Sequence, residues 1–446
     1  MHEKQLTRRK FLMLTTAGLG FAFLDSCGDG PTIPTTKGIP SSQSSCGLLQ
    51  TLSDNIIPEG LGINIHFTKP NQNDIDMIAS AGFGFVRMDF PWSDIERQKG
   101  IYDFSQQENL IKILANRGIR ALAILAYGNQ LYDNSTPPFH LGPQTDEVRQ
   151  AFARFAASAA ERFNKFDVVW EIWNEPNNSD FWKPKPNADE YVKLAKGTIE
   201  AIRKANSCAT IVAPAVITSF PNRNFDAWTF LERCFELDLL EQKIDAISVH
   251  LYRNQPPEEV VNDYNRLSDL FSRYKRKDGK ILPIISSEWG YPVTAGVSKE
   301  FQAALLVREF LINIIKGVPL SIWYDWQDDG KDPNNLDDNF GILTWDHQPK
   351  PTYFATQTLI KQLSGFHFKN RLSIPQLTTQ DFALLFMHEN VKKIVLWTTG
   401  VPHTIQLKID QTYTTIISVT GEKQSVTPTN GTLKMKLTGS PQYLST

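Results

Sequence analysis

The sequence predicts an α/β fold, a (β/α)₈ barrel followed by a small C-terminal antiparallel β domain. First, eight short β-like runs alternate with amphipathic helical patterns between residues 51 and 364, which implies parallel strands joined by right-handed crossovers. Second, no GxGxxG or GxxxxGK(S/T) motif follows the first run, so an open nucleotide-binding sheet loses support. Third, the chain after Ser364 changes to short alternating runs between turn residues, which is typical of antiparallel strands.

The expected elements follow from these patterns. The eight barrel strands are expected at Leu61–Phe67, Phe83–Phe90, Arg120–Tyr127, Asp167–Asn174, Thr210–Ala215, Asp245–Tyr252, Leu282–Glu288 and Leu320–Trp326. Helices are expected between them, for example at Asn109–Arg117, Asp146–Phe163, Asp189–Ala205, Glu258–Arg273 and Glu300–Lys316. Later strands are expected at Phe382–Met387, Lys393–Trp397, Thr404–Ile409, Thr414–Ser418 and Leu433–Leu437. We expect residues 365–446 to form a β-sandwich-like packing domain, with a sugar-binding module as the alternative.

The N-terminal residues 1–27 indicate an export signal. Arg8 and Arg9 precede an apolar run, Phe11–Leu24, that is shorter than the ~20 apolar residues of a membrane span. The segment resembles a twin-arginine signal, and its last four residues resemble a bacterial lipoprotein box with Cys27 as the lipidated residue. An ordinary signal peptide with a chance cysteine is the alternative. Residues 28–50 form a flexible linker, and we expect a periplasmic or cell-surface protein.

Charge and cysteine content narrow the classes of partner. The 46 Lys and Arg residues and 48 Asp and Glu residues give a formal net charge of −2. Because the basic residues are dispersed, we expect no nucleic-acid partner, and membrane contact only through a lipid anchor at Cys27. Cys46, Cys208 and Cys234 leave room for one disulfide and one free thiol, with Cys208–Cys234 as a candidate bridge. No CxxC pair occurs, and we predict no metal site and no cofactor.

Alternate residues of six expected strands are polar, charged or aromatic towards the strands' C-terminal ends. Side chains two residues apart share a face of a strand, and we call the residues of that polar face the polar phase of the strand. The polar phases are Asn64/His66, Phe85/Arg87/Asp89, Glu171/Trp173/Glu175, Ser248/His250/Tyr252, Ser286/Glu288 and Ser321/Trp323/Asp325. Barrel enzymes place their active sites at that rim, whereas a satisfied buried network is the alternative. We expect this phase to face the barrel interior and to form a site.

Two carboxylates stand out in this set. Glu175 ends the fourth strand in Trp170-Glu171-Ile172-Trp173-Asn174-Glu175-Pro176, and Glu288 ends the seventh strand in Ser286-Ser287-Glu288-Trp289-Gly290. Glycoside hydrolysis needs one carboxyl group that protonates the leaving oxygen and one carboxylate that attacks or activates water. Strands four and seven lie on opposing sides of an eight-stranded barrel. The two glutamates can therefore face each other across a sugar; two structural ion pairs are the alternative.

The paired motifs resemble the clan A retaining glycoside hydrolases, closest to family 39 with family 5 as a near neighbour. This resemblance spans roughly residues 61–363. It implies that Glu175 is the general acid/base and Glu288 the nucleophile. It also implies substrate-binding or orienting roles for a wider set of residues: Asn174 at the sugar 2-hydroxyl, Arg87 and Tyr252 beside Glu288, His250 beside either glutamate and His66 in the sugar pocket.

Some of these residues have structural alternatives. Arg87 could form a core ion pair with Asp89, and His66 and His250 could be satisfied core residues. Glu171 shares the phase of Glu175 but lies deeper in the strand, so we interpret it as structural.

Tryptophans are frequent near the predicted rim, and flat indoles stack on pyranose rings. Six follow or end strands: Trp92, Trp182, Trp289, Trp323, Trp326 and Trp345. Their number favours a groove that binds a chain, with Trp182, Trp289 and Trp323 as sugar-binding residues; scattered core tryptophans are the alternative. We therefore expect a retaining β-glycosidase that is endo-acting on an extracellular or envelope polysaccharide. The alternatives are an exo-acting β-xylosidase, a transglycosylase with the same residues and an inactive glycan-binding barrel.

Overall fold

In the computed structural model of the protein, the described residues are 46–52, 56–220, 223–294, 296–409 and 415–445. The predicted export signal, the candidate lipid anchor Cys27 and most of the predicted linker lie outside them. Among the described residues, no helix combines the length and apolar character that crossing a membrane requires.

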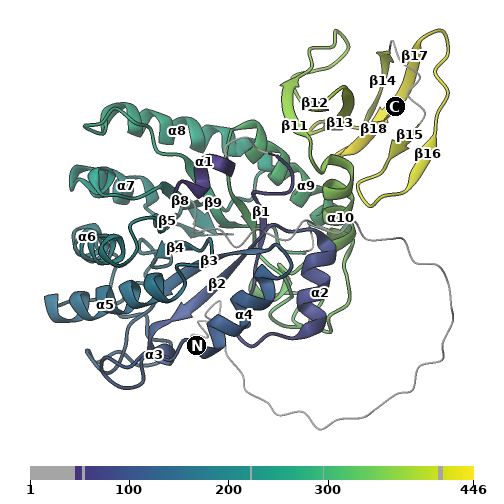
Figure 1. The fold of residues 1–446 in the computed structure, drawn as a ribbon. Helices are drawn as coiled ribbons and strands as arrows, with labels where there is room; N and C mark the ends of the chain where they lie inside the picture. The colour runs from purple at the N-terminus through teal and green to yellow at the C-terminus, as the bar shows by residue number, and fades with distance from the viewer. Residues whose placement is uncertain (1–45, 53–55, 221–222, 295, 410–414, 446) are drawn as a thin grey trace, which may run out of the picture.

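Eight parallel strands form a closed barrel, which confirms the predicted fold class (Figure 1). The strands are β1 (Leu61–Asn64), β2 (Phe85–Pro91), β3 (Arg120–Ala126), β4 (Val169–Ile172), β5 (Thr210–Ile217), β8 (Ala246–His250), β9 (Ile284–Trp289) and β10 (Ser321–Trp323). They are ordered β1-β10-β9-β8-β5-β4-β3-β2 around the barrel. Each of the eight expected strands therefore matches one observed strand.

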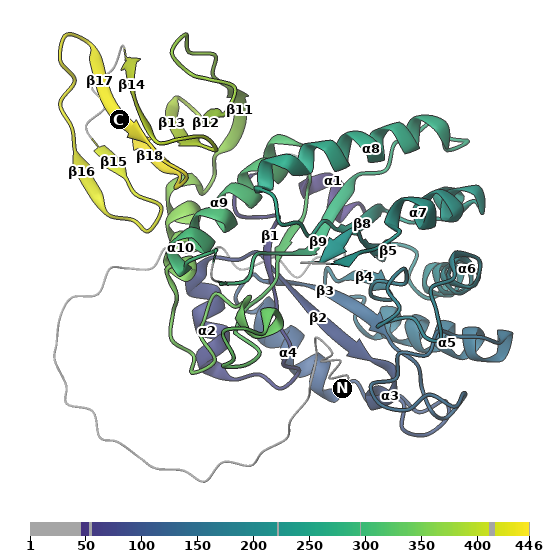
Figure 2. The same ribbon diagram turned by 180° about the vertical axis from the view of Figure 1, so that it is seen from behind.

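Helices surround this barrel, as both ribbon views show (Figures 1 and 2). The longer helices are α2 (Gln72–Ala81), α4 (Ser105–Ala115), α5 (Asp146–Arg162), α6 (Ala188–Ala205), α7 (Ala227–Glu236), α8 (Val260–Arg273), α9 (Lys299–Ile315) and α10 (Pro351–Leu363). Shorter elements are α1 (Leu48–Leu52), α3 (Trp92–Ile95), η1 (Leu239–Glu241), η2 (Pro257–Glu259), η3 (Leu336–Asn339) and the ribbon of β6 (Ser219–Phe220) and β7 (Arg223–Asn224). Several start at side-chain caps; Thr145, for example, accepts from Val148 N at 3.3 Å.

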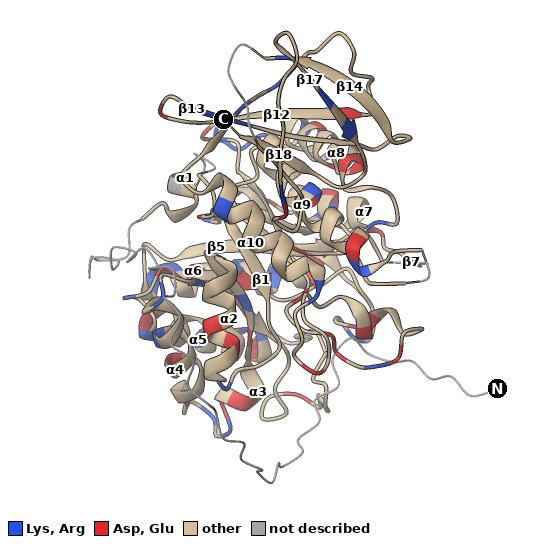
Figure 3. Cartoon of the chain, turned by 90° about the vertical axis from the view of Figure 1, so that its right-hand side faces the viewer, with Lys and Arg blue, Asp and Glu red and all other residues tan. Residues whose placement is uncertain are grey.

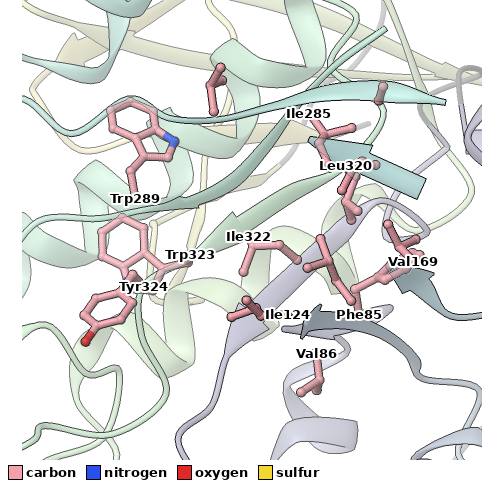
Figure 4. Close-up of a cluster of buried hydrophobic side chains, with 14 of the residues drawn as sticks. Phe85, Val86, Ile124, Val169, Ile285, Trp289, Leu320, Ile322, Trp323 and Tyr324 are labelled. Atoms are coloured by element: carbon pink, nitrogen blue, oxygen red, sulfur yellow. The ribbon is translucent and has the colours of Figure 1, made fainter. Parts of the chain in front are cut away.

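The register of the barrel corrects part of the predicted polar phase. Ile322 of β10 pairs with Gly62 of β1, which pairs with Phe85 of β2. A Cβ on Gly62 would lie 2.3 Å from Ile322 Cδ1 and 2.8 Å from Phe85 Cβ, so these three residues share one face. Figure 4 shows Ile322 and Phe85 beside Ile285 and Leu320 in the barrel interior. Ser321 therefore faces outward and accepts from Asn313 of α9 at 2.7 Å.

A β-bulge in β9 explains how Glu288 still reaches the interior. Ser286 pairs with Ser321 and Trp289 pairs with Trp323, so two residues of β9, Ser287 and Glu288, stand opposite one residue of β10. A bulge re-aims one side chain and shifts the alternation by one residue. Ser286 thus shares the outward face of Ser321, and strict alternation along β9 was the wrong assumption.

The C-terminal domain contains two antiparallel sheets. The larger sheet is β11-β12-β13-β18-β15-β16, and the smaller pairs β14 with β17. Their strands are β11 (His367–Arg371), β12 (Asp381–His388), β13 (Val391–Thr398), β14 (His403–Lys408), β15 (Thr415–Ile417), β16 (Lys423–Ser425), β17 (Thr432–Leu437) and β18 (Gln442–Ser445). The sequence patterns missed β11, β16 and β18, because β11 and β16 are short and largely exposed and β18 ends the chain.

Each face of the larger sheet has its own packing partner. Ile394 and Leu396 of β13 pack with Leu407 and Leu433 of the smaller sheet, whereas Val395 and Trp397 join the core of the barrel. Trp397 Nε1 also donates to Glu258 at 2.6 Å, and Arg308 of α9 binds both oxygens of Glu258 at 2.7 Å. The views agree that the domain lies beside α9 and α10 (Figures 1 and 2).

One disulfide joins Cys46 to Cys208, and Cys234 of α7 is a buried free thiol. The candidate bridge Cys208–Cys234 was therefore wrong, because Cys234 belongs to the core of the barrel.

Lys and Arg residues are interspersed with Asp and Glu residues over the face in Figure 3.

Glu309 on α9 is a fully buried carboxyl group whose two oxygens have no hydrogen-bond partner among the described residues. Burial raises the pKa of Glu309 well above its usual range, opposed in part by the charge of Arg253. A group with a raised pKa in the folded chain holds its proton more tightly there than in the unfolded chain. Its stabilising contribution is therefore full at low pH and is lost as the pH rises through the folded-state pKa.

We expect Glu309→Gln to remove this pH dependence. Above the ordinary glutamate pKa of 4.5, the wild type should lose about 1.4 kcal/mol of unfolding free energy per pH unit relative to the variant, until the folded-state pKa is reached. Urea unfolding of both proteins at about pH 5 and about pH 7 measures the difference. An equal difference at both pH values would show that Glu309 ionises in the folded chain as it does in the unfolded chain.

Candidate active site

Glu175 and Glu288 meet at the C-terminal end of the barrel, as predicted. One carboxylate oxygen of each glutamate and a ring nitrogen of His250 all lie within 4.8 Å of one another. Retaining glycosidases hold their two carboxyl groups about 5–5.5 Å apart, whereas inverting enzymes leave about 6.5–9.5 Å for a water molecule. The observed separation fits direct attack by one carboxylate on a sugar.

Two buried side chains donate hydrogen bonds to Glu288. Tyr252 Oη donates to Glu288 Oε1 at 2.8 Å, and Arg87 Nη1 donates to Glu288 Oε2. These three side chains are at most 2% exposed. Hydrogen bonds and a cation that favour the charged form keep a buried carboxylate ionised and oriented. The arrangement matches the roles that the resemblance implied for Arg87 and Tyr252.

Glu175 has a different set of partners. Its Oε2 accepts from Asn178 Nδ2 at 2.9 Å, and its Oε1 lies 2.9 Å from His250 Nδ1. His250 Nε2 faces Arg87 Nη2 at 3.4 Å. Because a guanidinium can only donate, Nε2 is the acceptor and Nδ1–H donates to Glu175. His250 therefore connects Glu175 to Arg87.

The backbone at the end of β4 is what aims Glu175. Trp173 has φ 67° and Glu175 has φ 47°, a left-handed region that non-glycine residues rarely adopt. Glu175 N donates to Ala215 O at 3.1 Å, which fixes this turn against β5. The same turn sends Trp173 outward, where it packs on Phe152 of α5, so Trp173 leaves the predicted interior phase. Such conformations cost of order 1–3 kcal/mol each and concentrate at functional sites.

Arg87 lies at the centre of these contacts. Its Nε donates to Glu171 Oε2 at 2.8 Å, its Nη1 donates to Asn64 Oδ1 at 3.1 Å and its Nη2 donates to Asn174 Oδ1 at 2.7 Å. Arg87 forms buried ion pairs with Glu171 and Glu288. One guanidinium therefore fixes the four strands β1, β2, β4 and β9.

His66 is the partly exposed member of the predicted set, and it lies in an acidic group that sequence reasoning only partly found. Its Nδ1 is 2.8 Å from Asp329 Oδ1, and its Nε2 is 3.9 Å from Asp325 Oδ2. Burial and the nearby charges of Asp329 and Asp328 raise the pKa of Asp325 well above its usual range. The signal for Asp329 was the acidic run Asp325–Asp329 directly after the last strand.

Within the described part of the chain, two groups contain ligand types that could hold a metal ion: Glu175 with His250 and Glu288, and His66 with Asp325 and Asp329. In the first group Arg87 and Tyr252 already donate to Glu288 and Asn178 donates to Glu175, so the oxygens have partners that suit an acid/base pair. The second group presents oxygens and a ring nitrogen that suit sugar hydroxyls equally well.

The tryptophans do not form the expected groove. Trp92, Trp182, Trp289, Trp323 and Trp326 are at most 2% exposed, and among the six only Trp345, at 46%, is exposed. Trp182 packs between Trp173 and Tyr191 of α6, outside the barrel. Trp289 and Trp323 pack on Tyr291. Sugar stacking by Trp182, Trp289 and Trp323 therefore has no support, because protein side chains cover their rings.

A different aromatic group lies beside Glu288. Phe340 has ring-centroid distances of 5.9 Å to Tyr252, 5.3 Å to Tyr324 and 5.9 Å to Phe220. Phe220 belongs to the short ribbon of β6 and β7, and Phe340 follows η3. Sequence reasoning missed both, because neither ends a barrel strand. These rings pack on Tyr252 and Tyr324 from two separate connections of the barrel.

Comparison with known proteins agrees with this geometry. A family model described as cellulase, glycosyl hydrolase family 5, matches residues 55–329. A β-xylosidase from Caldicellulosiruptor saccharolyticus is 27% identical over 253 residues, which cover 51% of this chain and 48% of that protein. A β-xylosidase from Geobacillus stearothermophilus is 29% identical over 136 residues, 29% of this chain and 24% of that protein. The matches thus span half or less of these relatives.

Solved structures extend the similarity over most of the chain. A family 39 glycoside hydrolase from the gut symbiont Bacteroides cellulosilyticus WH2 has a TM-score of 0.74 and 26% identity, covering 88% of this chain and 81% of that one. A family 39 β-xylosidase from Caulobacter crescentus has a TM-score of 0.63 at 16% identity, covering 86% of this chain and 95% of that one. The second similarity concerns the fold alone.

We expect Tyr252→Phe to lower kcat/KM for an aryl β-glycoside by about 10- to 100-fold, because a hydrogen bond to a charged group contributes roughly 1.5–3 kcal/mol. Tyr264→Phe is the matched control, since Tyr264 is also buried but donates to Asn313 at 2.7 Å in the outer layer. Steady-state kinetics of both variants give the answer. Equal losses in the two would mean that the Tyr252 hydroxyl acts through packing alone.

Proposed function

The chain belongs to the cellulase family of glycosyl hydrolases, family 5, within clan A, and we propose that it is a retaining β-glycosidase that works by double displacement on Glu175 and Glu288. The observation that carries the proposal is the pair of carboxylates within 4.8 Å, one held by Arg87 and Tyr252 and the other by Asn178 and His250. A glycan-binding barrel without activity would not need both sets of partners.

In the first step, an oxygen of Glu288 attacks the anomeric carbon. The C–O bond to Glu288 forms while the glycosidic C–O bond breaks, and Glu175 gives its proton to the leaving oxygen. Asn174 Oδ1 accepts from Arg87, so its amide N–H group is the donor left for the sugar 2-hydroxyl. Such a contact accelerates the reaction because it strengthens in the transition state.

In the second step, water displaces Glu288 from the anomeric carbon. Glu175, now a carboxylate, takes a proton from water, and the water oxygen attacks the anomeric carbon as the bond to Glu288 breaks. Glu288 leaves as a carboxylate, and two inversions give net retention. A sugar hydroxyl in place of water would give transglycosylation with the same residues.

The burial of the site favours exo action over the endo action that the number of tryptophans suggested. Glu175 is 0% and Glu288 2% exposed, and the rings of Phe220 and Phe340 lie over Tyr252. A chain end fits such an enclosed centre more easily than the middle of a polymer does. His66, Asp325 and Asp329 supply the hydroxyl-binding groups for that terminal sugar.

Substrate class and location complete the proposal. Two curated relatives are named β-xylosidase, so β-xylosides come first among the substrates, with an extracellular or envelope polysaccharide as their source. Export is supported by the twin-arginine-like start and by the disulfide Cys46–Cys208, since disulfides persist outside the reducing cytosol.

We expect azide to separate the two glutamate roles. Glu288→Ala should lose hydrolysis of an aryl β-glycoside, and azide should restore turnover by giving the α-glycosyl azide of inverted configuration. Glu175→Ala should lose about 10²–10⁴-fold with a poor leaving group, and azide should then give the β-glycosyl azide. Product configuration by NMR measures both. A β-azide from Glu288→Ala would exchange the two assignments.

We expect exo action to release one monosaccharide from the chain end of a β-linked xylo-oligosaccharide at every time point. Chromatography of early products from the wild type, with Glu288→Ala as the inactive control, tests this. A mixture of shorter oligosaccharides at early times, with a rapid fall in polymer viscosity, would restore the endo assignment.

A further inference from the structure

Glu171 is a second buried carboxylate on Arg87. It lies on β4 four residues before Glu175, is 0% exposed, and binds Arg87 Nε at 2.8 Å and Arg87 Nη2 at 2.7 Å through one oxygen, Oε2. Its other oxygen has no hydrogen-bond partner among the described residues. The sequence alone suggested a structural role for it.

In this cluster one positive charge faces two carboxylates. Arg87 carries one permanent positive charge, whereas Glu171 and Glu288 both contact it, and the three side chains are at most 2% exposed. A buried cation without a counter-ion is costly. Glu171 alone satisfies that need, so Glu288 can lose its charge during the reaction.

The proposed reaction makes this distinction important. When Glu288 attacks the anomeric carbon it becomes a neutral ester, and Arg87 then keeps Glu171 as its carboxylate partner. We propose that Glu171 is a positioning residue, the permanent counter-ion that holds Arg87 in place while Glu288 is esterified. The inference rests on the proposed double displacement.

Loss of the Glu171 charge has two consequences for the first step. Before substrate binds, Arg87 in this variant no longer interacts with a Glu171 charge, so it stabilises the Glu288 carboxylate more strongly. Glu288 is then a weaker nucleophile. In the glycosyl-enzyme of this variant, Arg87 lacks both the Glu171 charge and the Glu288 charge, which destabilises the intermediate. Both effects raise the barrier for formation of the ester, and the second lowers the barrier for its hydrolysis.

The test is Glu171→Gln, which keeps the size of the side chain and removes its charge. We expect kcat/KM for an activated aryl β-glycoside to fall about 10- to 100-fold, and any pre-steady-state burst of aryl alcohol to disappear because the intermediate no longer accumulates. The acid limb of the kcat/KM profile should move to lower pH. The variant keeps the other titratable side chains around the cluster, which are Glu175, His250, Tyr252, Tyr191 and Asp325.

Two further variants separate charge from structure. Glu171→Asp keeps the charge and should restore the acid limb and most of kcat/KM. Glu309→Gln makes the same substitution at another fully buried glutamate, on α9, where burial raises the pKa of the carboxyl group. It therefore tests the substitution without the loss of charge beside Arg87, and it should leave kcat/KM and the pH profile as in the wild type. Denaturant unfolding of each variant checks that it folds.

The outcomes are distinct. The counter-ion role is overturned if Glu171→Gln lowers kcat/KM but keeps the burst and the acid limb of the wild type. It is also overturned if Glu171→Asp changes the burst and the acid limb as Glu171→Gln does. If Glu171→Gln does not fold, Glu171→Asp decides in the same way. If the wild type cleaves no glycoside, or if azide does not rescue Glu288→Ala, the proposed function fails instead.

Discussion

The buried charge of Arg87 is the constraint on which the rest of the site depends. Its side chain is 0% exposed and contacts residues of β1, β4, β8 and β9 from its own place on β2. A guanidinium cannot be neutralised by losing its proton, so the barrel has to surround it with acceptors. Once Asn64, Glu171, Asn174 and Glu288 are gathered for that purpose, the Glu288 carboxylate and the Asn174 amide are already fixed beside each other.

The barrel supplies the geometry that makes this gathering possible. Parallel strands present their C-terminal ends at one rim, and two local departures from regularity then aim the glutamates. A left-handed turn after β4 directs Glu175, and a bulge in β9 directs Glu288. Gly62 permits Ile322 and Phe85 to fill the interior below. The packed apolar floor and the charged rim are therefore built by the same strands.

These particulars show what the sequence could and could not predict. The alternation of strands and helices, together with Glu175 and Glu288 at strand ends, was enough to predict the barrel and the pairing of the two carboxylates, because both depend on local patterns. Strict alternation failed at Ser286 and Trp173, where a bulge and a left-handed turn shift which side chains face inward. On β10 the alternation holds, but Ile322 rather than Trp323 faces the interior. Asp329, Phe220 and Phe340 come from loops, whose paths no local pattern fixes.

The tryptophans illustrate why residue type did not predict the shape of the site. An indole next to a strand end can face the substrate or fill the layer between strands and helices, and its apolar area favours burial in both cases. Here the outer layer takes Trp182, Trp289 and Trp323. The rings near Glu288 are instead Tyr252, Tyr324 and Phe340, which pack on one another. Arg87 contacts Glu288 directly and His250 connects it to Glu175, so one buried guanidinium links both carboxylates of the site without help from any tryptophan.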